Sequence, residues 1–207
     1  MDSLFRLTGF IPFILIIFFN AFVDLGHKIL IQNTVFKIYD GQTQIILTAI
    51  VNGLILVPFV LLFTPAGYLS DRHPKPLIMK VSAAVAVALT LLITLSYYLG
   101  WFRFSFAMTF LLAVQSAFYS PAKYGYIKEL TGKERLATVN GIVQAVTIVA
   151  ILFGIFAFSV FFEQALAGVS YNNAAQLPKT IAPVGWVLVA CAMALCVNLS
   201  PDTSCLG

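Results

Sequence analysis

The first long apolar stretch of the chain, residues 10–31, carries one acid and two basic side chains near its centre: Asp24, His27 and Lys28. The stretch has about the length that one helix needs to cross a bilayer. A charge near the bilayer centre costs roughly 2.5–3.5 kcal/mol on insertion scales, so charged groups at that depth usually face a protein interior or a water-filled path. The pattern therefore predicts a membrane helix with one specialised face.

The polar residues of this stretch share that face. Asn20, Asp24 and Lys28 recur at intervals of four, and His27 lies one helical turn from Asp24. Two interpretations fit: a buried Asp24–Lys28 ion pair that only fixes helix packing, or a polar stripe that lines a transport cavity. We favour the cavity. His27 is either a proton-coupling group beside Asp24 or a hydrogen-bonded packing residue.

Composition indicates an integral membrane protein. Hydrophobic residues make up 60% of the chain and charged residues 10%, and the mean hydropathy is +0.96, whereas soluble domains carry about 25% charged residues. The net charge of +4 is spread over short loops, which argues against a nucleic-acid partner. The three cysteines show no metal-binding spacing, and we expect neither a metal nor a cofactor.

Six continuous apolar runs predict an all-α membrane fold, because lipid admits only helices or closed barrels and a barrel needs alternating residues. Eight Lys and Arg residues fall on one side of the membrane and three on the other, so both chain ends are expected in the cytoplasm. Tyr97, Tyr98 and Trp101 fit an interfacial aromatic belt. The predicted membrane domain covers residues 1–200, followed by a short tail at 201–207, and its spans are 10–33, 45–69, 77–100, 104–121, 137–162 and 183–199.

The fourth and fifth spans add polar residues: Gln115, then Asn140 and Gln144. These side chains can face the same interior as the stripe on the first span. The alternative is a purely structural role, since buried amides often only bond one helix to another, which contributes about 0.6 kcal/mol on average.

The loop after the second span, residues 67–75, reads GYLSDRHPK. It resembles the G-x-x-x-D-[RK]-x-G-R signature of the major facilitator superfamily, with Pro74 at the usual glycine. Gly67 would permit close approach at a helix end, Asp71 could cap a helix or neutralise a positive helix end, and Arg72 could pair with an acid. The resemblance implies that these three residues stabilise one state of an alternating-access cycle; the alternative is a basic loop with no gating role.

Residues 119–125 read YSPAKYG, followed by Glu129-Leu and Asn140-Gly141. This pattern resembles the lysophospholipid transporter branch of that superfamily. It resembles still more the membrane domain of fused bacterial proteins that join such a transporter to a phospholipid acyltransferase and an acyl-carrier-protein ligase. One departure is Leu25 after Asp24, where standalone transporters of the branch usually have Asp-Asn.

The resemblance implies roles for two residues: Asp24 as the buried acid tied to the transport cycle, and Lys123 as a basic residue on the cytoplasmic side. It implies a lysophospholipid substrate, chiefly lysophosphatidylethanolamine, moved from the outer to the inner leaflet of a bacterial inner membrane for re-acylation. Two rivals are a transporter of another small solute, and a non-transporting membrane module that anchors an acyltransferase. The chain lacks the His-x4-Asp pair of such acyltransferases, so we do not expect an enzyme.

The superfamily fold uses two six-helix halves with the substrate site between them. This chain would be the N-terminal half, built from two inverted three-helix repeats, with its first and fourth helices facing the missing half. The expected partner is a C-terminal six-helix half or a second chain. We interpret the 207 residues as a truncation, in preference to a chosen domain boundary or a half that pairs with itself.

Overall fold

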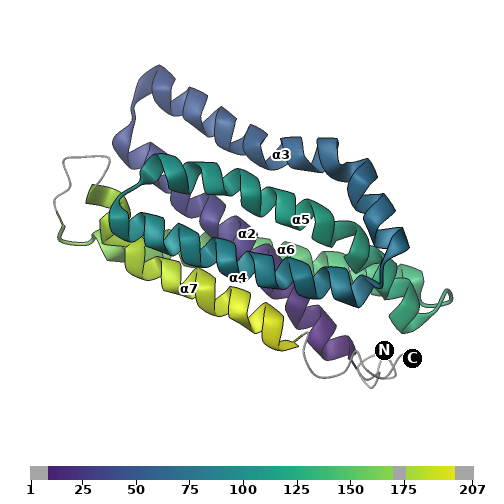
Figure 1. Cartoon of the computed structure of the whole chain (residues 1–207). Coiled ribbons are helices and arrows are strands. Elements are labelled where there is room, and N and C mark those ends of the chain that lie inside the picture. Colours follow the sequence, from purple (N-terminus) through teal and green to yellow (C-terminus); the bar gives the residue numbers. More distant parts are fainter. Residues whose placement is uncertain (1–8, 170–175, 199–207) are drawn as a thin grey trace.

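The computed structural model describes residues 9–169 and 176–198. Within these residues the chain forms a bundle of six long helices and no strand (Figure 1). The helices are α2 (Phe10–Ile38), α3 (Gly41–Arg72), α4 (Lys75–Leu99), α5 (Phe102–Thr131), α6 (Leu136–Leu166) and α7 (Gln176–Asn198). The all-helical prediction is confirmed for this part of the chain.

Short turns join α2 through α6 and make these successive helices antiparallel. The α4–α5 turn needs Gly100, whose φ of 72° lies in the left-handed region that glycine adopts without strain. The starts of α2, α4 and α6 therefore lie at one end of the bundle together with Arg72, which we call the Arg72 end. The opposite end, where α2 finishes, is called the Lys37 end.

Five of the helices in the described residues are long and apolar enough to cross a membrane, and α5 is the exception. The sequence predicted six apolar spans. The 30-residue α5 has ample length, but it carries Thr109, Gln115 and Ser116, all of them buried. Thr109 and Ser116 face α2, where their hydroxyls contact His27 and Asp24.

The helices extend past the predicted apolar spans. α3 continues through Pro58 and Pro65 to Arg72, and α7 begins at Gln176, ahead of Pro183. Hydropathy marks only the stretch suited to lipid, whereas backbone hydrogen bonding continues into the polar ends. The predicted tail at 201–207 lies outside the described residues.

Apolar packing forms two clusters along the bundle. One lies toward the Lys37 end and includes Leu30, Val35 and Phe158. The other lies toward the Arg72 end and includes Phe13 and Ile127. The centre of the bundle, between these clusters, is where the polar residues of α2 and α5 meet.

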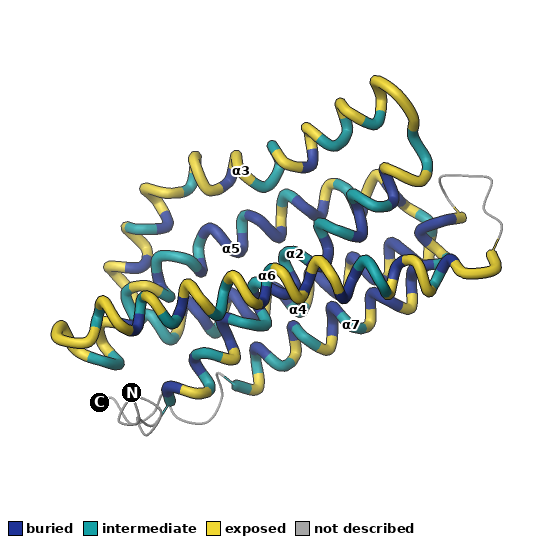
Figure 2. The backbone as a smooth tube through the Cα atoms, turned by 180° about the vertical axis from the view of Figure 1, so that it is seen from behind, coloured by how far each residue is buried: buried dark blue, intermediate teal, exposed yellow. Residues whose placement is uncertain are grey.

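The outer helices expose large apolar surfaces. In their most apolar stretches, 11% of the residues of α3 and 28% of those of α6 are buried, against 50% for α2. Figure 2 shows α3 with exposed residues along most of its length. The expectation that α2 and α5 face a missing half stays a prediction, and α3 is the helix with the largest exposed apolar face.

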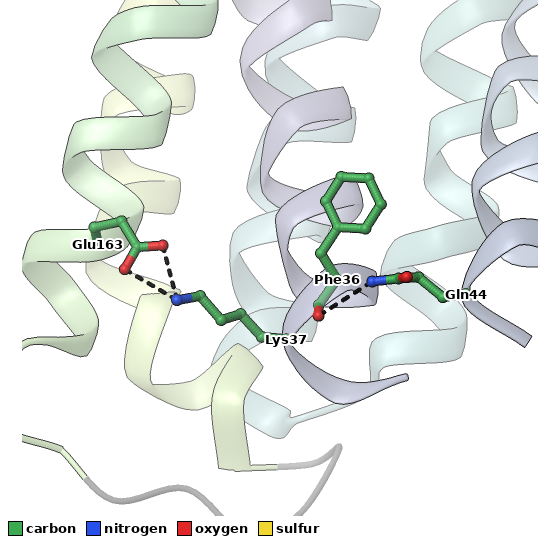
Figure 3. A network of polar contacts seen from close by, with 4 residues as sticks. All are labelled: Phe36, Lys37, Gln44 and Glu163. Atoms are coloured by element: carbon green, nitrogen blue, oxygen red, sulfur yellow. Dashed lines mark hydrogen bonds and ion pairs between the residues drawn. The ribbon is translucent and has the colours of Figure 1, made fainter. Parts of the chain in front are cut away.

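An ion pair joins α2 to α6 at the Lys37 end (Figure 3). The Lys37 ammonium lies 2.9 Å from one Glu163 oxygen and donates to the other at 3.1 Å. The Gln44 amide also donates to the Phe36 carbonyl, which ties the start of α3 to the end of α2.

Replacing Lys37 by Met should lower the free energy of unfolding by less than about 1 kcal/mol, because water and salt screen an exposed pair. The two side chains are 37% and 61% exposed. Thermal unfolding in detergent at low and high salt checks this expectation. A large drop in unfolding temperature that persists at high salt would contradict it.

Candidate functional site

Asp24 and Ser116 meet at the centre of the bundle. Asp24 is midway along α2, and Ser116 is midway along α5. The Ser116 hydroxyl donates to Asp24 Oδ2, and the Asn20 amide donates to the same oxygen at 3.2 Å. Hydrogen bonds to a charged group contribute about 1.5–3 kcal/mol, so this contact holds the carboxylate in place.

Lys28 does not pair with Asp24. The ion pairs among the described residues are Lys37–Glu163 and Lys75–Glu129. The alternative of a packing ion pair between Asp24 and Lys28 is therefore wrong for this structure. Ser116 and Asn20 donate hydrogen bonds to the Asp24 carboxylate instead.

Asp24 and Lys28 line one small cavity of about 100 Å³ between α2, α3 and α5. Ile55 and Phe59 of α3 form its apolar wall, and Ser116 lies beside Asp24. An acid and a base that face the same space without neutralising each other can hold a guest that carries both charges.

His27 is fully buried next to this cavity and bonds to two other helices. Its Nδ1 lies 2.9 Å from the Tyr97 hydroxyl of α4, and its Nε2 lies 3.2 Å from the Thr109 hydroxyl of α5. A neutral imidazole donates from one nitrogen and accepts at the other, which matches two hydroxyl partners. The placement of Tyr97 in an interfacial belt is wrong, because its side chain is buried against His27.

Replacing His27 by Leu should destabilise the bundle by about 2–4 kcal/mol, because two buried hydroxyls lose their partner. The triple variant His27→Leu, Tyr97→Phe, Thr109→Val should recover most of that loss, since no polar group is then left alone. Unfolding temperatures in detergent compare the two. If the triple variant is as unstable as the single one, His27 does more than satisfy these hydroxyls.

Gln115 agrees only in part with the prediction that its side chain faces the same interior as the polar stripe of α2. It is buried next to Ser116, whose hydroxyl lies 3.3 Å from Gln115 Oε1. The Gln115 amide nitrogen, however, is buried without a hydrogen-bond partner, and the residue lines a different cavity, between α3, α4 and α5.

Lys123 and Gln144 lie toward the Arg72 end. The Lys123 ammonium sits 4.7 Å from the centre of the Tyr124 ring, and its charge interacts with the Asp24 carboxylate. The Gln144 amide donates to the Tyr124 hydroxyl at 2.8 Å on an exposed surface. Asn140 is half-buried one turn earlier. The contact of Gln144 is therefore with Tyr124 and not with the polar stripe of α2.

Sequence reasoning missed Ser116 and Thr109 as partners of the stripe. The two residues are seven positions apart on α5, and this spacing puts them on one helix face. That spacing was the available signal, and it matches the face on which α5 meets Asp24 and His27.

Comparison with known families matches residues 7–199 to the Major Facilitator Superfamily. The chain belongs to this superfamily. The six helices of the described residues are consistent with one half of the superfamily's fold. No solved structure matches the chain.

Similar curated proteins are named lysophospholipid transporter, so the resemblance to the lysophospholipid transporter branch is confirmed. One from Photorhabdus laumondii is 36% identical over 143 residues, which are 66% of this chain and 32% of the relative. One from Serratia proteamaculans is 34% identical over 122 residues, 57% of this chain and 27% of the relative. One from Yersinia enterocolitica is 33% identical over 145 residues, which are 66% of this chain and 32% of the relative. The match thus spans about a third of the length of these relatives or less. The resemblance to fused transporter–acyltransferase proteins stays a prediction.

The superfamily signature at residues 67–75 adopts a different local structure from the one predicted. A Cβ at Gly67 would meet nothing within 4 Å, so no described residue approaches this glycine closely. Asp71 is exposed in the last turn of α3, near helix carbonyls rather than at a positive helix end, and no side chain caps the start of α4. The expected helix-capping role of Asp71 is therefore wrong.

Arg72 also lacks the predicted acidic partner within the described residues. Its guanidinium donates to the Tyr68 hydroxyl at 2.6 Å and lies 5.7 Å from the centre of that ring. Tyr68 is one turn earlier on α3, so the contact stays within one helix and leaves the positive charge uncompensated.

Proposed function

We propose that the chain forms one six-helix half of a transporter for lysophospholipids, chiefly lysophosphatidylethanolamine. The substrate moves from the outer to the inner leaflet of a bacterial inner membrane, where an acyltransferase partner re-acylates it. The Arg72 end and both chain ends face the cytoplasm. Support comes from the relatives named lysophospholipid transporter and from the bias of basic residues toward the Arg72 end.

The observation that carries the proposal is an acid and a base, Asp24 and Lys28, that line one cavity at the bundle centre without an ion pair between them. The head group of lysophosphatidylethanolamine has an ammonium, which suits Asp24, and a phosphate, which suits Lys28. Polar residues are costly at this depth, and a zwitterionic guest offsets that cost. His27 and Ser116 hold α2 and α5 in the register that presents both charges.

The cavity, with a volume of about 100 Å³, is lined by one six-helix unit alone. A second six-helix unit would enlarge the site, since transporters of this type bind substrate between their halves.

The signature residues Gly67, Asp71 and Arg72 suit a contact with that second unit at the cytoplasmic side. Gly67 has open space beside it, Asp71 is exposed, and the Arg72 charge has no carboxylate partner in the described part of the chain. Lys123, Asn140 and Gln144 would receive the head group on the same side.

The direct test is saturable binding of radiolabelled lysophosphatidylethanolamine to the full chain in lipid nanodiscs, followed by uptake into vesicles. Unlabelled lysophosphatidylethanolamine should displace the label, whereas a sugar should not. Displacement by a sugar would support transport of a polar solute. Absence of saturable binding would contradict the proposal.

A further inference from the structure

A long apolar groove lies between α3, α4 and α5, on a side of α5 other than the Asp24 cavity. Its volume is about 460 Å³, and its lining is apolar except for His73, Ser82 and Gln115. Val81, Val85 and Leu89 form the α4 wall, while Leu111 and Phe118 of α5 form the floor. The groove exists because α3 and α4 both pack on α5 and make few contacts with each other.

The groove has the length of one membrane leaflet. Its lining on α4 runs from Leu77 to Leu89, about 18 Å along a helix axis. Half of a bilayer's hydrocarbon core is about 15 Å. A groove of this length and volume can take a hydrocarbon chain that lies along the helices.

The mouth of the groove carries positive charge. His73 lines the groove at the Arg72 end, and Arg72 directly precedes it. No carboxylate among the described residues pairs with Arg72, although Asp71 is exposed beside it. In the proposed orientation this end lies at the depth of the inner-leaflet phosphates, which a guanidinium binds strongly.

The groove adjoins the Asp24 site through Gln115. This residue lines the groove one turn from Leu111 on α5, and its Oε1 lies 3.3 Å from the Ser116 hydroxyl that holds Asp24. The groove and the Asp24 cavity therefore lie on two sides of one segment of α5.

We propose that the groove binds the acyl chain of a lysophospholipid in the cytoplasmic leaflet, with its phosphate at Arg72 and His73. It is a site separate from the Asp24 cavity, suited to the lipid once its head group has reached the cytoplasmic side. The inference rests on the proposed orientation and substrate class, and its test is arranged so that the two proposals can fail separately.

The test uses the full chain carrying Asp24→Asn, in nanodiscs, so that residual binding of radiolabelled lysophosphatidylethanolamine reports on the groove. Val85→Trp fills the groove and should weaken this binding at least about tenfold, or 1.4 kcal/mol. Leu92→Trp, at an exposed α4 position outside the groove lining, is the matched control and should change it less than about twofold.

Two outcomes would overturn the inference: no saturable binding in the Asp24→Asn protein, or equal binding by the Val85→Trp and Leu92→Trp proteins. A monoacylglycerol with the same chain should compete poorly, and equal competition would overturn the phosphate contact.

A lysophosphatidylethanolamine with a photoreactive chain end gives a second measurement. It should label the α4 and α5 residues at the deep end of the groove, around Leu89 and Leu111, and labelling confined to α6 or α7 would contradict the site. If the parent protein shows no uptake of lysophosphatidylethanolamine into vesicles while the groove is labelled, the proposed function fails and the groove stands.

Discussion

Replacing Asp24 by Asn should weaken the binding of lysophosphatidylethanolamine about a hundredfold. Asn keeps the size of the side chain and an oxygen that can accept from Ser116, but it removes the negative charge. Removing one charge of a buried pair leaves the other charge, here the ammonium of the lipid, without its partner and costs about 2–5 kcal/mol. A cost of about 2.8 kcal/mol is a hundredfold in affinity.

No other acid in the described residues can substitute for Asp24. The remaining ones, Asp40, Asp71, Glu129, Glu134 and Glu163, lie at or near the ends of helices. A guest ammonium at the bundle centre therefore depends on a single carboxylate.

Thr34→Val provides the matched control on α2. The Thr34 hydroxyl donates to the Leu30 carbonyl within its own helix, and Thr34 does not line the Asp24 cavity. Its replacement should change the affinity less than about twofold. Equilibrium binding to the full chain in nanodiscs measures both variants. If Asp24→Asn binds within a factor of two of the parent protein, Asp24 is not the ammonium partner.

The fold was largely predictable because the bilayer limits the possibilities. Long apolar runs in lipid must become helices, and the recurrence of Asn20, Asp24 and Lys28 placed them on one face without any knowledge of the neighbours. α5 shows the limit of this reasoning. A helix whose polar side is covered by protein loses apolar character, so hydropathy alone separates it poorly from a non-spanning helix.

The contacts of the site were less predictable because they depend on which helix lies opposite. Asp24 pairs with Ser116, far away in the sequence, although Lys28 is a nearer candidate. Tyr97 stands at a helix end, where aromatic residues often mark the interface, yet its hydroxyl turns inward to His27. In both cases a partner on another helix outweighs the local pattern.

A close contact between α2 and α6 lies beside the site, at Gly26. A Cβ at this position would overlap a ring carbon of Phe158 on α6. That ring is fully buried, and its centroid is 5.0 Å from that of Phe22. The ring has no room to move away, so a methyl group here must push α2 and α6 apart.

Gly26→Ala should therefore lower stability by about 1–3 kcal/mol, the usual cost of overpacking a core. In a chain of this length that corresponds to about 2–4 °C in unfolding temperature per kcal/mol. Because Gly26 directly precedes His27, displacement of α2 should also weaken lysophosphatidylethanolamine binding.

Gly141→Ala on α6 is the matched control, since a Cβ there meets nothing within 4 Å. Ala is the better helix former by about 1 kcal/mol, so this variant should be as stable as the parent or more so. Adding Phe158→Leu to Gly26→Ala should cost less than the sum of the two single changes, because the smaller side chain makes room for the methyl group. Unfolding temperatures in detergent measure all of these proteins. Equal temperatures for Gly26→Ala and Gly141→Ala would mean that α2 and α6 can separate at little cost, and that the position of Asp24 does not depend on this contact.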